Sequence, residues 1–183
     1  MVSKKGILIV LIRNNIKAMT SHRIIDSIRK VCTVSALIVI SLFISSCDEN
    51  RFYERNELIT NDTWYFDDAK KFEVEINDSL ESYNFYINVR NTVDYGFSNL
   101  YFFIKTEFPD GVLAQDTVEC QLANLEGKWL GEGRGKFRDN IFILRKNIHF
   151  KQIGTYHFTL MQGMRQDSLK GIADVGIRME IAE

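Results

Sequence analysis

Residues 70–90, KKFEVEINDSLESYNFYINVR, decide the fold class. Every second residue from Phe72 to Ile76 is apolar, and a second alternating run covers residues 83–90. Alternation with a period of two is typical of a β-strand that buries one face. Residues 77–79, Asn-Asp-Ser, are a turn signal between the two runs. The stretch therefore predicts two consecutive strands.

Further apolar or alternating runs follow at residues 100–106, 118–122, 141–150, 156–160 and 175–181. Residues 100–106 are apolar on both faces, which predicts a central strand or a strand covered by a partner. Helical periodicity is weak: any helix should be short, and residues 116–125 and 164–170 are the only plausible places for one. The chain is therefore predicted to be mainly β, an antiparallel β-sandwich of immunoglobulin-like or jelly-roll-like type with about seven to eight strands.

An apolar leader precedes this region. Residues 31–44, VCTVSALIVISLFI, follow directly after Arg29 and Lys30. A membrane-spanning helix needs about 20 apolar residues, whereas a basic flank before a shorter apolar core is typical of a signal peptide. Ile44-Ser45-Ser46-Cys47 then resembles the lipobox of bacterial lipoproteins, in which the leader is cut before the cysteine. The cysteine thiol of such proteins carries diacylglycerol, and the new amino terminus receives a fatty acid such as palmitate.

Three segments follow from this motif. We expect residues 1–46 to be a signal helix that is removed, residues 47–62 a polar tether lipidated at Cys47, and residues 63–183 the β-sandwich domain. Counting from Met19 gives a leader of 28 residues, within the usual length of about 15 to 30, so we interpret Met19 as the true start. A buried core cysteine and a transmembrane anchor are the alternative interpretations.

Charge is divided between the leader and the mature chain. Residues 1–46 carry a net charge of +6, and residues 47–183 carry a net charge of −7. The acidic mature chain argues against nucleic-acid partners, whose phosphates favour basic patches.

No catalytic or metal-binding constellation stands out in the mature chain. His149 and His157 fall on the polar phase of their strands, where exposed side chains are expected. Cys120 shares a phase with apolar neighbours, which predicts a small core residue rather than a nucleophile. Because Cys120 is the only cysteine after the lipid site, no internal disulfide is expected. We expect no enzyme activity, no metal, and no cofactor apart from the covalent lipid.

A glycine-rich segment, GKWLGEGRG at residues 127–135, lacks the spacing of a P-loop or a dinucleotide-binding motif. One interpretation is a long hairpin loop with glycines at positive φ. The other is an exposed docking loop led by Trp129 and Arg134.

A second marked segment covers residues 162–177. Arg165 either pairs with Asp167 or Asp174 to fix a connection, or contacts a partner. The candidate partner-binding residues are therefore Trp129, Arg134 and Arg165.

An ordered set of short motifs runs through the mature chain. It comprises Cys47 with Phe52-Tyr53, Trp64, Tyr83 to Arg90, Tyr95, Asn99-Leu100-Tyr101, Asp110-Gly111, Asp116-Thr117, Gly127 to Gly131, Gly154-x-Tyr156-x-Phe158, Met164-Arg165 and Gly171 to Gly176. This set resembles the gliding-motility-associated lipoproteins of the GldH type, found in the Bacteroidetes. The resemblance implies a lipid-anchored component required for gliding and associated with the envelope machinery that supports type IX secretion. It implies no enzymatic activity, and only Cys47 has a role to carry over.

The preferred hypothesis is a non-enzymatic lipoprotein, anchored in the outer membrane and facing the periplasm, that binds envelope proteins of this machinery. Exposure at the cell surface is left open, and the sequence specifies no small-molecule ligand. The alternative is a glycan-binding or carbohydrate-processing envelope lipoprotein. A hydrolase would require carboxylates or histidines that converge in a cleft.

Overall fold

The computed structural model describes residues 50–182, and most of them are in β-strands. Ten strands and one single-turn 3-10 helix follow in the order β1 (Arg51–Leu58), η1 (Thr60–Asp62), β2 (Thr63–Tyr65), β3 (Lys70–Ile76), β4 (Ser82–Thr92), β5 (Asn99–Glu107), β6 (Leu113–Gln121), β7 (Phe137–His149), β8 (Gly154–Gln162), β9 (Ser168–Lys170) and β10 (Ile172–Ile181). Within this part of the chain, no helix has the length and apolar character needed to cross a membrane.

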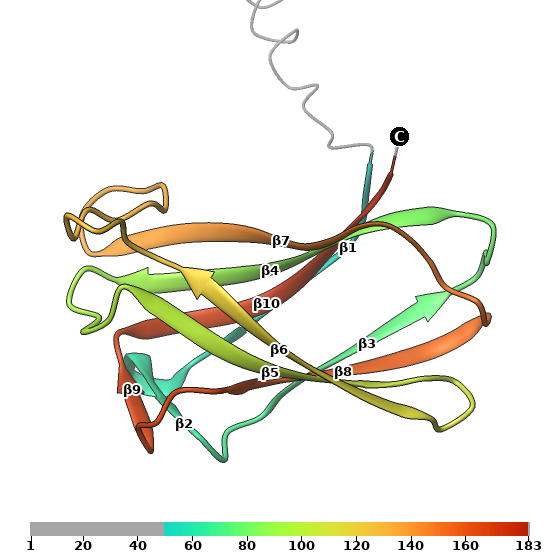
Figure 1. The fold of residues 1–183 in the computed structure, drawn as a ribbon, viewed down its shortest axis with the longest axis horizontal. Coiled ribbons are helices and arrows are strands. Elements are labelled where there is room, and N and C mark those ends of the chain that lie inside the picture. The colour runs from blue at the N-terminus through green and yellow to red at the C-terminus, as the bar shows by residue number, and fades with distance from the viewer. Residues whose placement is uncertain (1–49, 183) are drawn as a thin grey trace, which may run out of the picture. The chain divides into compact units, whose positions relative to one another are not determined.

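The strands form two four-stranded antiparallel sheets and a short ribbon. The first sheet has the order β1-β10-β4-β7, the second has the order β3-β8-β5-β6, and β2 pairs with β9. Figure 1 shows the two sheets facing one another, with the ribbon at one end. The predicted antiparallel β-sandwich is confirmed. Its described part has more strands than expected. The strands β2 and β9 are only three residues long, too short to show an alternating pattern, and β1 lies in the segment that the sequence predicts to be a tether.

The expected tether at residues 47–62 is wrong where the structure describes it. Residues 51–58 form β1, which pairs with β10 from Arg51 to Leu58. Charged residues fall on both faces of RFYERNEL, so its alternation does not reveal a strand. The backbone N–H and C=O groups of residues 51–58 find their hydrogen-bond partners on the edge of β10. The β-domain therefore begins at residue 51 rather than at residue 63.

Neither of the two places considered for a short helix is helical. Residues 116–121 belong to β6 and residues 168–170 to β9. In β6, Val118 lies opposite Phe102 and Cys120 opposite Leu100, so pairing with β5 overrides the weak helical pattern. β5 itself lies between β8 and β6, which confirms the central strand predicted at residues 100–106.

The core lies between the sheets. In β3, Phe72, Val74 and Ile76 are buried while Glu73 and Glu75 are exposed, as the alternation predicts. Aromatic rings connect the layers: the ring of Phe85 in β4 lies 5.0 Å from the ring of Phe158 in β8.

Trp64 ties the ribbon to this core. Its side chain is completely buried, its indole Nε1 donates to the Asp68 carbonyl at 2.7 Å, and its ring lies 5.6 Å from the ring of Phe102. The isolated Trp64 of the sequence is therefore a packing residue.

Candidate partner-binding surfaces

His149, His157 and Cys120 are the histidines and the cysteine of the described domain. His149 and His157 are exposed, and His157 Nδ1 lies 3.6 Å from Glu73 Oε1. Cys120 is buried, and burial raises the pKa of its thiol to about 12. Across residues 50–182, no group of three His, Cys, Asp or Glu side chains could hold a metal ion.

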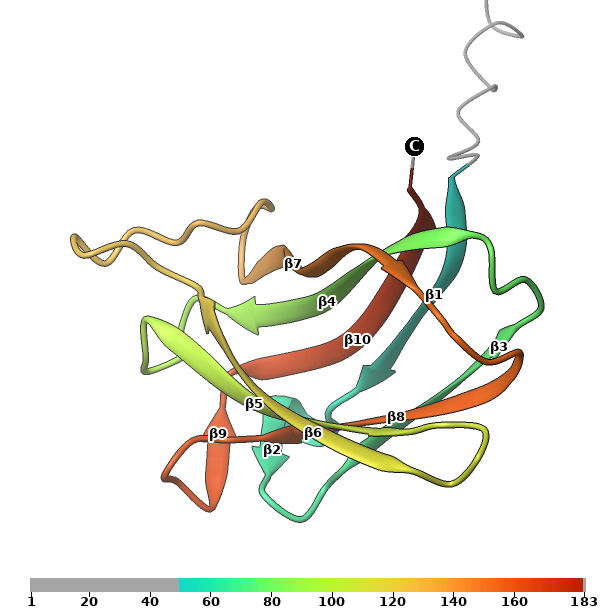
Figure 2. The ribbon, with the colours of Figure 1, turned by 45° about the vertical axis from the view of Figure 1, so that its right-hand side comes forward.

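Three connections gather at one end of the sandwich, which we call the loop end. They are residues 93–98 after β4, residues 122–136 after β6 and residues 163–167 after β8. Figures 1 and 2 show all three beside the same ends of the sheets, on the left of each view. The Ser98 carbonyl accepts hydrogen bonds from the backbone N–H groups of Leu122 and Ala123 at 2.7 and 2.9 Å. The first two connections are thereby held together.

The connection at residues 122–136 crosses between the sheets, because β6 belongs to the second sheet and β7 to the first. The predicted hairpin loop is therefore wrong, whereas the predicted glycines at positive φ are present. Gly127, Gly133 and Gly135 have φ values of 78°, 126° and 69°. Backbone hydrogen bonds in both directions pair Glu132 with Asp139 and hold part of the loop along β7.

The tip residues of this loop do not lie as the docking interpretation expects. Trp129 is half-buried and packs against the hydrophobic core. Leu125, Leu130 and Arg134 are among the exposed side chains of this connection, and Leu130 has 56% of its surface exposed. Trp129 therefore holds the loop on the core, while Arg134 is presented to solvent.

The connection at residues 163–167 is fixed by Gln162 and not by Arg165. Gln162 is buried; its Nε2 donates to the Gln166 carbonyl at 2.7 Å, and its Oε1 accepts from the Met164 N–H at 2.8 Å. Asp174 pairs with Arg90 instead, with 3.5 Å between Nη1 and Oδ2. Within residues 50–182, the structure records no ion pair between Arg165 and either Asp167 or Asp174, so the interpretation that such a pair fixes the connection is wrong. Arg165 is exposed at the tip of a fixed turn.

Arg165 lies beside a hollow of about 550 Å³, whose lining also includes Phe97, Tyr101, Gly163, Met164 and Gln166. Phe97 is 39% exposed, and its ring packs against Tyr95 with 5.6 Å between centroids. Phe97 and Tyr101 were not among the sequence candidates. The sequence does contain a signal for Tyr101. It is an aromatic residue on the face of β5 that points away from the core, in a strand whose core-facing residues are also apolar.

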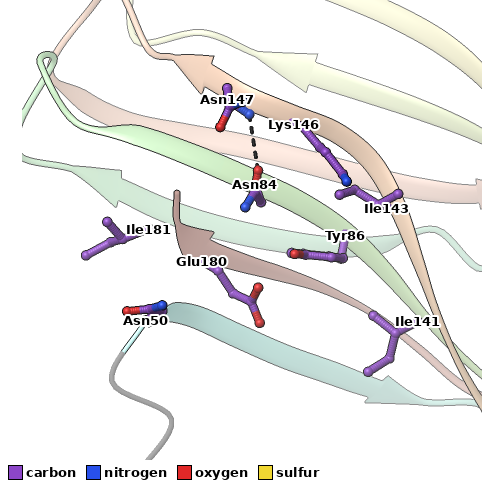
Figure 3. A pocket seen from close by; sticks show the side chains of 9 residues that line it. All are labelled: Asn50, Asn84, Tyr86, Ile141, Ile143, Lys146, Asn147, Glu180 and Ile181. Atoms are coloured by element: carbon purple, nitrogen blue, oxygen red, sulfur yellow. Dashed lines mark hydrogen bonds between the residues drawn. The ribbon is translucent and has the colours of Figure 1, made fainter. Parts of the chain in front are cut away.

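A second hollow, of about 560 Å³, lies on the outer face of the first sheet. It is lined by Asn50, Asn84, Tyr86, Ile141, Ile143, Lys146, Asn147, Glu180 and Ile181. Figure 3 shows Tyr86 between the two isoleucines and the polar end of the hollow, where the Asn147 N–H donates to Asn84 Oδ1 at 3.2 Å. Glu180 forms an ion pair with Arg178. Asn50 places this hollow at the end of the domain where β1 begins.

A family model described as GldH lipoprotein matches residues 51–179. The chain belongs to the GldH lipoprotein family. The match runs from the first residue of β1 almost to the end of β10, so it covers both sheets. As a lipoprotein of this family the chain is membrane-anchored. Cys47, its expected lipid site, lies outside the described residues.

Two similar proteins carry the family name. The gliding motility lipoprotein GldH homolog of Christiangramia forsetii is 34% identical over 83% of this chain and 97% of its own. The gliding motility lipoprotein GldH of Flavobacterium johnsoniae is 29% identical over 79% of this chain and 93% of its own. Among solved structures, dimeric latent PorU from Porphyromonas gingivalis aligns with 73% of this chain and 13% of its own chain, at 6% identity and a TM-score of 0.32. That score carries no argument about function.

Proposed function

We propose that this protein is a lipid-anchored, non-enzymatic interaction module of the cell envelope, and that it binds proteins of the machinery for gliding and type IX secretion. The names of the two GldH relatives support a role in gliding motility. We place the anchor at Cys47 in the outer membrane, with the domain facing the periplasm. A diacylated or triacylated cysteine would make the anchoring stable, because a single acyl chain binds membranes only marginally.

With a lipid on Cys47, the end of the domain where β1 starts is the end near the membrane. Arg51, its first residue, is four residues after Cys47. Four extended residues span at most about 14 Å. A lipid on Cys47 therefore holds this end of the first sheet close to the membrane surface. The hollow around Asn50 lies at the same end, where lipid headgroups limit the access of a large protein partner.

The loop end lies away from the anchored end. Strand β4 joins the two: Tyr83 lies opposite Ile181 near the start of β1, while the residue after Thr92, Val93, donates its N–H to the Lys136 carbonyl in the long loop. The eleven residues of β4 span about 30 Å at the usual rise of a strand. This separation is the observation that carries the proposal, because with a lipid on Cys47 three converging connections would face away from the membrane.

Anchoring supplies the second element of the mechanism. Tethering to the membrane raises the concentration of the loop end near other envelope proteins without any new contact. Leu130 and Arg134 on one connection and Arg165 on another are the exposed side chains that we assign to partner contacts, with Trp129 as a positioning residue.

Site-specific photocrosslinking in the native envelope tests the proposal. A photoreactive amino acid replaces Arg134 at the loop end or, as a matched control, Lys71 on the outer face of the second sheet; both positions are exposed. We expect crosslinks from position 134 to gliding or secretion components, identified by mass spectrometry, and none to them from position 71. Equal recovery from both positions, or recovery of no such component from position 134, contradicts the proposal.

A further inference from the structure

The hollow beside Arg165 combines one exposed cation with apolar walls. Phe97, Tyr101 and Met164 supply the apolar surface. Glu119, which lies opposite Tyr101 in the pairing of β5 with β6, is already engaged: its Oε1 accepts from Asn99 Nδ2 at 2.6 Å, and hydrogen bonds from Asn99 and the Tyr101 hydroxyl lower its pKa. Among the residues that line this hollow, Arg165 is the charged one.

The turn that carries Arg165 is ordered before any partner arrives. Gln162 closes the turn through both ends of its amide, to Gln166 and to Met164. The Gly163 N–H donates to the Tyr101 carbonyl at 2.7 Å, and the Tyr101 N–H donates to Met164 Sδ at 3.4 Å. A Cβ on Gly163 would lie 3.2 Å from the Tyr101 carbonyl oxygen, so the glycine permits this close approach. Little backbone freedom remains to be lost on binding, which favours affinity.

We propose that this hollow binds a carboxylate carried next to an aromatic or large apolar side chain on a protein partner. This inference rests on the proposed interaction function and names the chemistry of the partner. The planar guanidinium of arginine matches a carboxylate through two parallel hydrogen bonds. The adjacent apolar side chain of the partner covers Phe97 and Met164, as in sites where a few polar groups orient a ligand on an apolar lining.

Lipid phosphate is a less suitable occupant because of the anchor. The hollow belongs to the loop end, at the far end of β4 from residue 51, whereas the lipid on Cys47 holds the opposite end near the membrane. A carboxylate from a protein segment reaches the loop end without this constraint.

Small-molecule probes test the chemistry directly. N-acetylphenylalanine carries both a carboxylate and a ring; N-acetylphenylalaninamide lacks the charge, and acetate lacks the ring. Residues 49–183 form a unit with its own core, so the domain from residue 48 onward can be labelled with ¹⁵N and titrated. We expect saturable shifts at the amides of Tyr101 and residues 163–166 with N-acetylphenylalanine, and binding at least about fivefold weaker with either comparison probe.

Variants separate the two halves of the site. Arg165→Gln should weaken binding of N-acetylphenylalanine about tenfold, and Arg165→Lys should restore it only in part, because lysine lacks the planar fork. Phe97→Ser should weaken binding while leaving acetate unaffected. Arg145→Gln, which removes an exposed arginine on β7, is the matched control and should bind like the wild type. The spectra of the variants also report whether each remains folded.

Equal binding of the acid and the amide, unsaturable shifts spread over the surface, or unchanged affinity in Arg165→Gln would each overturn this inference. The photocrosslinking experiment tests the proposed interaction function separately. Crosslinks from position 134 to machinery components with no probe binding would refute the hollow alone. Probe binding with no such crosslinks would refute the proposed function and retain the hollow as a carboxylate site.

Discussion

Replacing Gly171 with alanine should destabilise the domain by about 3 kcal/mol. Gly171 joins β9 to β10 with a φ of 97°, a region that costs an L-residue roughly 1 to 2 kcal/mol. A Cβ there would lie 2.8 Å from the Tyr95 Cα and 2.9 Å from the Thr92 Oγ1. The backbone cannot shift to relieve this overlap without cost, because two hydrogen bonds hold residue 171. The Gly171 N–H donates to the Asp62 carbonyl at 2.7 Å, and the Gly171 carbonyl accepts from the Thr92 N–H at 2.8 Å. Overpacking of this kind adds about 1 to 3 kcal/mol.

Two other glycines separate the conformational cost from the steric cost. Gly111 has a φ of 81° with no atom within 4 Å of its Cβ position, so Gly111→Ala should cost only about 1 kcal/mol. Gly176 has no positive φ, but a Cβ would overlap the Arg55 carbonyl and the Asn56 side chain. Gly176→Ala should cost about 2 to 4 kcal/mol, because the overlap also disturbs the hydrogen bond from Asn88 Nδ2 to Asn56 Oδ1 at 3.1 Å.

Urea unfolding, followed by tryptophan fluorescence on the domain from residue 48 onward, measures all three costs. The expected order of destabilisation is Gly111→Ala well below Gly176→Ala and Gly171→Ala, with similar m-values. For a domain of this size, a loss of about 3 kcal/mol lowers the Tm by roughly 10 °C. If Gly171→Ala cost no more than Gly111→Ala, the close approach of residues 92–95 to the β9–β10 turn would be refuted.

Three further outcomes are expected. The Cys120 thiol should resist a thiol reagent at about pH 8 until the domain is unfolded, because burial raises its pKa to about 12; rapid reaction in the folded state would contradict this burial. Burial also raises the pKa of Asp174, while Arg90 lowers it and Asp139 raises it. The Asp174 carboxyl therefore binds its proton more tightly in the folded protein than in the unfolded chain. Its contribution to the free energy of unfolding falls as the pH rises from about 4 through the raised pKa. In NMR titrations, Arg90→Ala should move that pKa upward and Asp139→Asn downward; shifts in the opposite directions would be inconsistent with this assignment. Radiolabelled palmitate should label the wild type but not Cys47→Ala, and equal labelling would exclude Cys47 as the lipid site.

The core strands and their phases could be predicted because alternation is written into consecutive residues. In β3 the phase assigns each side chain to a face, and all three apolar residues from Phe72 to Ile76 are buried. The positive φ values in residues 127–135 were likewise predictable, because glycine is the residue that adopts them without strain.

Other features depended on partners distant in the sequence. The glycine-rich residues around Trp129 are typical of an exposed loop, yet Trp129 packs against the core. No sequence pattern marks Gln162 as a structural residue, yet the nitrogen and the oxygen of its amide both hydrogen-bond within the turn that presents Arg165. Each outcome is set by which surface the residue meets after folding, and no local pattern encodes that surface.

The sequence by itself determined the β-rich class of the fold, the lipoprotein character and the acidic mature chain, because strand phase, the lipobox and charge are properties of residues and their near neighbours. The tertiary structure alone decided that residues 51–58 are a strand, since they need the edge of β10, whose paired residues lie more than 100 positions away. It also decided that Phe97, Tyr101 and Arg165 share one hollow. The physical reason is the same in both cases: cross-strand hydrogen bonds and side-chain contacts join residues whose separation along the chain carries no information about their distance in space.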